Sequence, residues 1–547
     1  MHLTFIRHLS LTTSLPPSFG CPVQRAAPSN RFGAASAEHL PVSQLARLET
    51  HISRLILTAD TVYKIKKPLK LPFLDFSTLP QRLACCLAEV RLNARFAPDI
   101  YLDVVSLHGP PEQPRWSLTP VTAAGADPSG PLGPAIEYAV RMRRFDDAQR
   151  LDRVCARGEL TAAHISELAG EIARFHAIAA VAPPDAPWAT PQRVLALALD
   201  NFDDLQGLWW PASSPASATA PDATRQRLAA LREWTQAQGA ALAPLMAQRK
   251  ATGHVRECHG DLHLANIVLI DGRVRLFDCI EFNDELRWID TLAEVAFTYV
   301  DLLDHRVPGL AGWFADAVLE HSGDHDAAAL LRFYAVYRAM VRAKVAALRD
   351  AQTHAPGEPD AHAEALGYLA QAEALAAPPT PRLVITHGLS GCGKTVASTA
   401  LVQGDAHGAM LRLRSDVERK RLFGLAPLAA SGSAHGQGIY SREANTRTYD
   451  HLAERATALL RAGWSVVVDA AFLRRAERDR FRALAADCGA GFAILAPEAP
   501  VAELRARIER RRARGQDASE ATLEVLERQL EVVEPLNDDE QTLRLPD

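Results

Sequence analysis

The stretch HGDLHLAN, residues 259–266, decides the fold of the first part of the chain. It is followed by the apolar run Ile267–Ile270, by Asp271-Gly272, and by a second apolar run that ends at Phe277-Asp278. An Asp-Gly pair between two β-rich runs predicts a hairpin with a two-residue turn. The chain therefore has a polar loop and a second aspartate at the two ends of a predicted β-hairpin.

The order of polar residues in this segment suits phosphoryl transfer. That reaction needs an oriented acceptor hydroxyl, bound metal ions and an environment that offsets the charge of the moving group. An aspartate can accept the hydroxyl proton, and an amide five residues later and an aspartate after the next strands can hold magnesium. Asp261, Asn266 and Asp278 have this order and spacing. A plain polar loop with an Asn helix cap is the alternative for the short motif alone.

At these residues the chain resembles the aminoglycoside phosphotransferase and choline kinase group, which is related to protein kinases. The resemblance implies that Asp261 is the catalytic base and that Asn266 and Asp278 are magnesium ligands. It does not imply an antibiotic substrate.

A lysine and a glutamate upstream complete the kinase-like pattern. In a kinase-like fold a strand supplies the lysine that pairs with the α- and β-phosphates. Matching the predicted strand 61–65 to the V-A-I-K pattern selects Lys64, with Lys66 as the alternative and a solvated basic cluster as the structural explanation. Glu89, on a helix predicted over 79–96, is the expected ion-pair partner of Lys64.

The chain departs from protein kinases at the loop that covers the phosphates. It has no GxGxxG motif there, and residues 49–60 contain no glycine. Antibiotic kinases often use a serine-containing loop, so Ser53 is the candidate for this role.

A second nucleotide site is predicted after the Pro-rich segment 376–381. A β-rich run leads into residues 388–395, GLSGCGKT, and then into an alanine-rich stretch, which matches G-x-x-x-x-G-K-[ST] in its strand–loop–helix setting. Backbone N–H groups of such a loop close around phosphate, and the following helix N-terminus favours the anion. Lys394 should reach the β/γ-phosphates and Thr395 should ligate magnesium. The predicted nucleotide-binding residues are Gly388, Ser390, Gly391, Cys392, Gly393, Lys394 and Thr395.

Two aspartates follow predicted strands of this second half. Asp416 comes after the strand 410–413, and Asp469 comes directly after the strand 464–468. Ligands of a parallel α/β sheet meet the carboxyl ends of its strands. We expect Asp469 to bind magnesium and Asp416 to orient the acceptor hydroxyl or act as base. The two roles can be exchanged, and helix caps are the structural alternative.

An arginine-rich segment over 504–514 resembles the lid of small-molecule P-loop kinases such as gluconate kinase and adenylylsulfate kinase; polynucleotide kinases share the outline. The resemblance implies that Arg507 and Arg511 offset transition-state charge. An exposed arginine-rich helix is the alternative. Ser519 is predicted to cap the next helix.

Length, net charge, apolar runs and cysteine content limit the class of protein to which the chain can belong. At 547 residues the chain is too long for one core, and its net charge of −5 gives no general attraction to nucleic acid or anionic membranes. No apolar run approaches the roughly 20 residues of a membrane span. Eight scattered cysteines without metal-ligand spacing suggest thiols in a reducing cytoplasm. We predict a disordered N-terminus over 1–40, a kinase-like domain over 41–375, a linker over 376–381 and a P-loop domain over 382–547.

The order of these parts resembles bacterial fusion proteins described as bifunctional aminoglycoside phosphotransferase/ATP-binding proteins. The resemblance covers residues 41–535 and includes the stretches 49–53, 63–68, 73–79 and 440–443. It implies an α+β protein-kinase-like fold followed by an α/β P-loop NTPase fold.

We expect two sites that use ATP and Mg²⁺ to phosphorylate hydroxyl groups of small molecules. Regulatory ATP-binding modules without turnover are an alternative for one or both halves. A polynucleotide-type kinase is an alternative for the P-loop half, although the acidic net charge argues against nucleic acid. The acceptors and the oligomeric state stay open.

Overall fold

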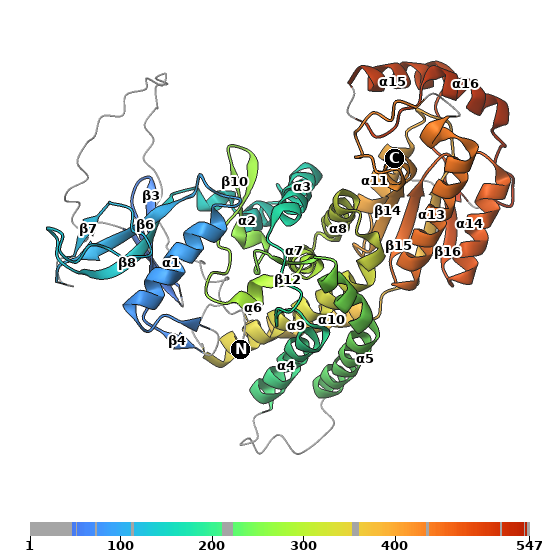
Figure 1. Ribbon diagram of the computed structural model, residues 1–547. Helices are drawn as coiled ribbons and strands as arrows, with labels where there is room; N and C mark the ends of the chain where they lie inside the picture. Colours follow the sequence, from blue (N-terminus) through green and yellow to red (C-terminus); the bar gives the residue numbers. More distant parts are fainter. Residues whose placement is uncertain are drawn as a thin grey trace, which may run out of the picture. The chain divides into compact units, whose positions relative to one another are not determined.

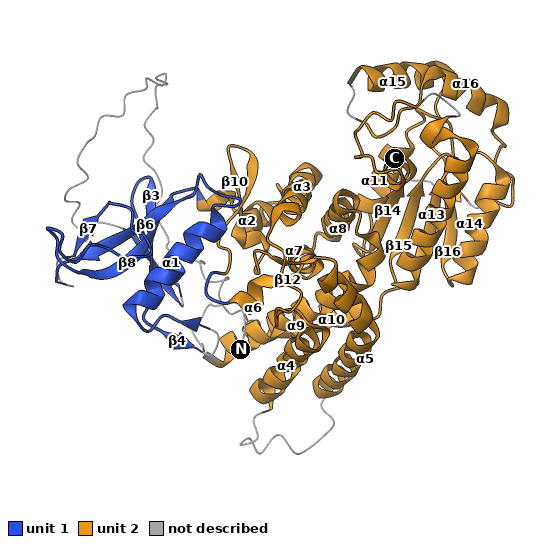
Figure 2. Ribbon diagram, in the orientation of Figure 1, with its two compact units in different colours: residues 1, 3–146, 281–283 blue, residues 2, 147–280, 284–547 orange. Residues whose placement is uncertain are grey.

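The structure is a computed structural model that describes residues 46–50, 52–71, 74–110, 114–210, 223–352, 360–433, 437–514, 517–540 and 542–543. The predicted disordered segment 1–40 lies outside the described residues. The chain forms two compact units (Figure 2). Unit 1 comprises the described residues up to 146 together with 281–283, and unit 2 comprises the others. The predicted domain boundaries stay a prediction, because the two units do not coincide with the predicted domains. Unit 2 contains the P-loop part together with most of the predicted kinase-like domain.

Unit 1 is built on a six-stranded antiparallel sheet with the order β1-β2-β3-β8-β6-β7. The predicted strand over 61–65 is confirmed as β3. Helix α1 packs against β6 and β8 (Figure 1). It begins where expected, because Thr78 and Gln81 form a capping box. The elements are β1 Ala46–Glu49, β2 Ser53–Leu57, β3 Thr61–Lys66, β4 Lys70–Leu71, β5 Leu74–Asp75, α1 Leu79–Asn93, β6 Tyr101–His108, β7 Arg115–Ser117 and β8 Ala135–Arg143.

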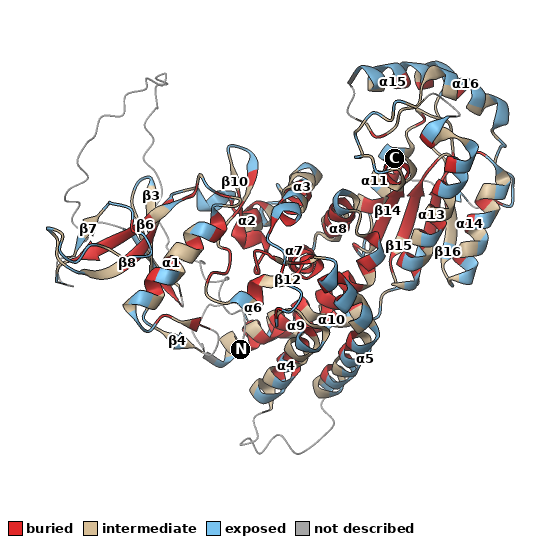
Figure 3. Ribbon diagram, in the orientation of Figure 1, coloured by how far each residue is buried: buried red, intermediate tan, exposed pale blue. Residues whose placement is uncertain are grey.

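The first part of unit 2 is mainly helical, and its helices surround the loop at residues 259–266. Helix α7 is almost wholly buried, as Figure 3 shows, and packs against α8 and α9. The helices and strands of this first part are α2 Leu151–Ala156, α3 Ala162–Ile178, α4 Pro191–Trp209, α5 Ala223–Ala251, β9 Val255–Glu257, β10 Ile267–Ile270, β11 Arg273–Leu276, α6 Asp284–Arg287, β12 Trp288–Asp290, α7 Thr291–Asp304, α8 Pro308–Ser322, α9 Ala328–Gln352 and α10 Ala361–Ala376. It also has the 3-10 turns η2 Asp147–Gln149, η4 Leu264–Asn266 and η5 His325–Ala327.

The second part of unit 2 is an α/β layer structure. Its five strands are parallel, in the order β14-β15-β13-β16-β17, and helices α11, α13 and α14 pack against them (Figure 1). The predicted strands are confirmed as β13, β14 and β15. The elements are β13 Arg382–Thr386, α11 Lys394–Gln403, β14 Met410–Arg414, α12 Ser415–Leu422, η6 Gly438–Tyr440, α13 Arg442–Arg461, β15 Ser465–Asp469, α14 Arg475–Asp487, β16 Gly491–Leu495, α15 Val501–Arg514, α16 Leu523–Val532 and β17 Thr542–Leu543.

The α/β part packs tightly on the helical part within unit 2. The buried Trp464 donates its indole N–H to the carbonyl of Ala328 at 3.0 Å. Arg332 of α9 stacks on the Trp464 ring and donates to the carbonyls of Ala462 and Gly463 at 2.9 and 2.7 Å. These contacts explain why the two parts fall into one compact unit.

Two further expectations concern membrane-spanning helices and the state of the cysteines. In the part of the chain that the structure describes, no helix is long and apolar enough to cross a membrane. The described cysteines are free thiols, as the scattered spacing predicted.

Candidate functional site

The segment that carries Asp261, Asn266 and Asp278 forms the predicted loop and hairpin. Strands β10 and β11 pair from Ile267 opposite Leu276 to Ile270 opposite Arg273, and the turn residues Asp271 and Gly272 have φ of 51° and 72°. The Asn266 amide donates to the backbone and side-chain oxygens of Asp261 at 2.9 and 3.3 Å. The structure therefore brings two of the three predicted catalytic-loop residues into direct contact.

Asp278 follows the hairpin in a left-handed conformation, with φ of 64°. Aspartate is one of the few residues with a side chain that adopt this backbone readily, and strained backbones cluster at functional sites. His259 connects this end of the hairpin to the loop, because its Nε2 lies 2.8 Å from the carbonyl oxygen of Phe277.

A buried glutamate of α7 forms hydrogen bonds with the backbone of the loop at residues 259–266. The carboxylate of Glu294 accepts hydrogen bonds from the backbone N–H groups of His259 and Gly260, and its second oxygen lies 2.6 Å from His176 Nε2. His176 is itself buried in this contact. Gly260 has φ of 89°, and a Cβ there would lie 2.7 Å from the carbonyl oxygen of Leu286. The loop conformation thus depends on a glycine and on a distant glutamate that sequence reasoning missed.

Asp261 is buried yet favours its ionised form. Burial alone would raise the pKa of this carboxyl, but the adjacent His263, whose Nε2 lies 3.6 Å away, lowers the pKa below its ordinary value. A carboxylate that stays charged can accept a proton from a hydroxyl group as the hydroxyl attacks.

In unit 1 the predicted lysine–glutamate pair is present, and both lysine candidates take part. Lys64 Nζ lies 2.8 Å from Glu89 Oε1, and Lys66 contacts both Glu89 and Glu281. Burial alone would lower the pKa of Lys66, but the charges of Glu281 and Glu89 raise it. Glu281 was missed, because nothing in its local sequence indicates a partner that is 215 residues away. Ser53 is the first residue of β2, where the connection from β1 ends, and it is fully buried, so its predicted phosphate role stays a prediction.

The predicted P-loop joins β13 to α11. Gly388, Gly391 and Gly393 have φ of 140°, 87° and 104°, which residues with side chains rarely adopt. A Cβ on Gly391 would also lie 2.9 Å from the carbonyl oxygen of Leu504 in α15. The Lys394 ammonium donates to the carbonyls of Gly388 and Leu389, each at 2.8 Å. The loop has the glycine-dependent shape that lets backbone N–H groups surround a phosphate.

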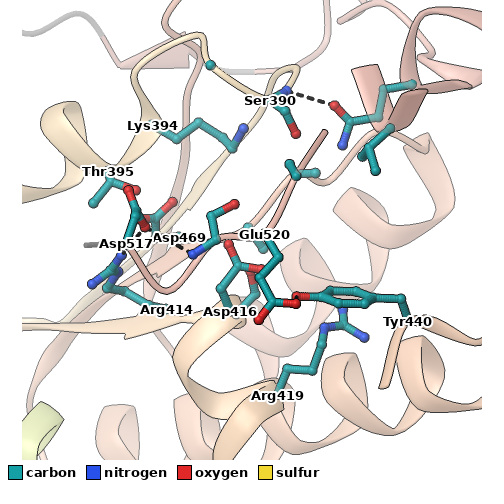
Figure 4. Close-up of a pocket in the computed structure, with 18 of the residues that line it drawn as sticks. Ser390, Lys394, Thr395, Arg414, Asp416, Arg419, Tyr440, Asp469, Asp517 and Glu520 are labelled. Atoms are coloured by element: carbon teal, nitrogen blue, oxygen red, sulfur yellow. Dashed lines mark hydrogen bonds and ion pairs between the residues drawn. The ribbon is translucent and has the colours of Figure 1, made fainter. Parts of the chain in front are cut away.

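A cavity of about 850 Å³ opens beside this loop (Figure 4). Among its lining residues are the predicted Ser390, Gly391, Gly393, Lys394, Thr395, Asp416, Asp469, Arg507 and Arg511. The buried Cys392 instead packs with Leu504 of the lid helix. A cavity of this size is typical of small-molecule sites. The tertiary structure therefore brings together site residues that were predicted in four separate segments of the sequence.

The oxygen donors around α11 fit a magnesium ion. Thr395 lines the cavity, and Asp469, at the end of β15, accepts a hydrogen bond from Ser398 one turn further along α11 at 3.2 Å. Mg²⁺ prefers carboxylate and hydroxyl oxygens and keeps several waters. Asp469 thus lies on the side of the cavity next to the P-loop helix, as its predicted metal role requires.

The predicted lid residues come from α15. Arg507 donates to the carbonyl of Gly391 at 3.2 Å and pairs with Glu503. Arg511 donates to the carbonyl of Ala521 at 3.4 Å. The prediction that Ser519 caps the next helix is wrong: α16 begins after Thr522, whose hydroxyl accepts from the N–H of Val525. Thr522 stands directly before the first helical residue, so its hydroxyl can reach the free N–H groups of the first turn, whereas Ser519 lies three residues earlier.

Several polar residues of the cavity were not predicted. They are Arg414, Arg419, Tyr440, Asp517, Glu520 and Gln529. Gln529 accepts a hydrogen bond from the N–H of Ser390 at 2.7 Å, so α16 also contacts the P-loop. The signals that could have found them are the polar positions around Asp416, in Arg414-Ser415-Asp416-Val417-Glu418-Arg419, and the stretch 440–443 that the family resemblance already marked.

A comparison with known proteins finds a family model for the C-terminal part of the chain and several solved structures with a likeness to the chain. A family model described as an AAA domain, AAA_33, matches residues 383–536. Structures with a likeness to the chain include a choline/ethanolamine kinase family protein from Mesorhizobium loti, with 13% identity, a TM-score of 0.37 and coverage of 63% of this chain and 90% of that one. Another is an aminoglycoside phosphotransferase from Alicyclobacillus acidocaldarius, with 16% identity, a TM-score of 0.34 and coverage of 63% and 97%.

Full-length relatives are found among mycobacterial proteins. "Uncharacterized protein Rv2004c" of Mycobacterium tuberculosis and "Uncharacterized protein Mb2027c" of Mycobacterium bovis are each 31% identical to the chain over 477 residues, which is 87% of this chain and 88% of theirs. The chain therefore belongs to the same family as these two mycobacterial proteins.

Proposed function

We propose that the chain is an ATP-dependent phosphotransferase with two nucleotide sites, each of which transfers the γ-phosphoryl group of ATP to a hydroxyl group of a small molecule. The observation that carries the proposal is the cavity of unit 2, where the P-loop, two aspartates and two lid arginines face one space. Phosphoryl transfer depends on this combination of positioning and charge.

For the P-loop cavity, we propose the following reaction, which the set of lining side chains supports. Asp416 accepts the proton of the acceptor hydroxyl, the hydroxyl oxygen bonds to the γ-phosphorus, and the bond from γ-phosphorus to the bridging oxygen breaks. The electron pair of that bond stays on the β-phosphate of the ADP that leaves. Lys394, Arg507 and Arg511 offset the charge that moves in this step. Thr395 and Asp469 would hold magnesium, which when bound neutralises charge on the phosphate oxygens.

For the kinase-like half, we propose Asp261 as base, with Asn266 and Asp278 as the residues that would hold magnesium. The contact between Asn266 and Asp261 within unit 2 supports this assignment. Lys64 would bind the α- and β-phosphates, and its ion pair with Glu89 within unit 1 supports that role. Lys66 shares the same glutamate, so it stays the alternative.

Single-turnover assays with radiolabelled ATP test both sites on the full chain. The acceptor panel contains sugars, aminoglycosides, amino alcohols, nucleosides and phosphorylated sugars. Lys394→Ala should abolish transfer to P-loop acceptors, and Asp261→Asn should abolish transfer to acceptors of the kinase-like half. Asp271→Asn, in the exposed hairpin turn, and Arg510→Ala, on the exposed side of the lid helix, are matched controls. Undiminished transfer in both active-site variants refutes the proposal, whereas ATP binding without transfer to any acceptor would favour regulatory nucleotide sites.

A further inference from the structure

The P-loop cavity contains a buried arginine that forms no ion pair with a carboxylate of the described residues. Arg419 of α12 is only 6% exposed. Its guanidinium donates to the carbonyl of Ile439 at 3.0 Å and to the side-chain oxygen of Asn445 at 2.9 Å, and its Nε has no hydrogen-bond partner. Both partners are neutral. Among the residues that the structure describes, no carboxylate forms an ion pair with this guanidinium.

Two other arginines of the cavity differ from Arg419 in this respect, whereas the half-buried Arg511 also forms no ion pair among the described residues and donates to the carbonyl of Ala521. Arg414 pairs with Glu320 and Asp517, and Arg507 pairs with Glu503. A buried charge without a counter-ion is costly, because it loses its hydration and gains no opposite charge in return. A guanidinium left in this condition inside a cavity is suited to an anion that arrives with the ligand, since its fork of N–H donors matches carboxylate and phosphate oxygens.

The position of Arg419 assigns it to the acceptor rather than to ATP. The Tyr440 ring covers the guanidinium, with 5.4 Å between the guanidinium carbon and the ring centroid. Asp416 lies three residues earlier in α12, so both side chains emerge on neighbouring positions of one helix face. In Figure 4, Arg419 and Tyr440 lie at one end of the cavity lining and Lys394 lies at the other, with Asp416 between them.

We propose that the acceptor of the P-loop site is a hydroxyl compound that also carries an anionic group, a carboxylate or a phosphate monoester, and that Arg419 binds this anion. The anion places the hydroxyl beside Asp416, while the triphosphate occupies the P-loop. This proposal rests on the function proposed above for the same cavity. It excludes neutral sugars, polyols and unphosphorylated nucleosides as good acceptors of this site.

The first test measures anion binding directly. Full-length protein saturated with Mg²⁺ and a non-hydrolysable ATP analogue is titrated with inorganic phosphate and, separately, with acetate, at constant ionic strength in chloride. Its melting temperature reports binding. Both anions should raise the melting temperature of the wild type. Arg419→Met should weaken this anion binding at least tenfold while leaving the affinity for the ATP analogue within twofold, and Arg419→Lys should be intermediate. Arg447→Met is the control, because this arginine of α13 stacks on Phe423 and does not line the cavity.

The second test measures transfer with matched acceptor pairs in the Asp261→Asn background, so that the P-loop site is observed alone. The pairs are glycerate and glycerol, ribose 5-phosphate and ribose, and a nucleoside 3′-phosphate and its nucleoside. At least one charged member should be preferred over its neutral partner, and Arg419→Met should lower kcat/KM for it about 100-fold, mainly through KM. Whether the preferred member is a carboxylate or a phosphate identifies the anion.

The outcomes separate this proposal from the proposed function. Anion binding that is absent from the wild type, or equal in Arg419→Met and the wild type, overturns the anion site. Equal use of charged and neutral acceptors overturns it as well. Anion binding that needs Arg419, together with no transfer to any acceptor, would retain the anion site and refute the kinase function of the cavity.

Discussion

The hydrogen bonds between Glu294 and the loop at residues 259–266 allow a graded test of what holds that loop in place. Glu294 is fully buried, and its carboxylate accepts from two backbone N–H groups and contacts His176. Burial alone would raise the pKa of Glu294, but the hydrogen bond and charge of His176 lower it, so the side chain is ionised at neutral pH. Glu294→Ala removes all three contacts, and Glu294→Gln keeps the shape and removes the charge.

The contacts of Glu294 set the expected loss in the free energy of unfolding for each variant. Glu294→Ala leaves three buried polar groups without their partner, at about 1–3 kcal/mol each. With some water entering the cavity, we expect a loss of about 3–6 kcal/mol in the free energy of unfolding. The glutamine carbonyl can still accept from the N–H groups of His259 and Gly260, and its amide can still reach His176. Glu294→Gln should therefore cost only about 1–2 kcal/mol, the difference between charged and neutral hydrogen bonds.

Urea unfolding followed by circular dichroism measures both losses, and amide hydrogen exchange at His259 and Gly260 reports the loop itself. Both amides should exchange faster in Glu294→Ala. The control is Glu171→Ala on α3, which breaks a half-exposed pair with Arg174 and should change stability by less than about 0.5 kcal/mol. A loss in Glu294→Ala no larger than that of the control, or equal losses in the Ala and Gln variants, would refute the reasoning.

Two further predictions concern the packing between the two parts of unit 2. Burial lowers the pKa of His325 to about 4, below the ordinary 6.5, so the unfolded chain takes up the proton first as pH falls, and stability should drop by about 2 kcal/mol from pH 8 to pH 5. Urea unfolding of the wild type should show this loss and His325→Gln should lack it; an identical pH dependence in both contradicts the idea. A Cβ on Gly309 of α8 would lie 1.9 Å from the carbonyl oxygen of Gln403, so Gly309→Ala should lower stability by at least about 2 kcal/mol. Gly367→Ala in α10 meets no atom within 4 Å and should instead raise the melting temperature slightly, and equal melting temperatures of the two variants would contradict the packing argument.

Local patterns in the sequence were enough to predict the elements of both candidate sites. The Asp271-Gly272 turn needs a left-handed backbone at both positions, and aspartate and glycine tolerate it, so the hairpin could be predicted from a few residues. The P-loop could be predicted for the same reason, because its three glycines adopt φ values that other residues avoid. The pair of Lys64 and Glu89 followed from the match to the V-A-I-K pattern and from the lysine–glutamate pair of kinase-like folds.

The sequence by itself therefore determined the fold class, the order of the parts and the residues whose roles depend on near neighbours. Only the tertiary structure decided the partners that come from distant segments: Glu281 for Lys66, Glu294 for the catalytic loop, and Glu320 for Arg414. The physical reason is that a buried charge must be paired, but many carboxylates in the chain could supply the pair. Packing selects one of them, and packing also decides that Arg419 receives none from the described residues.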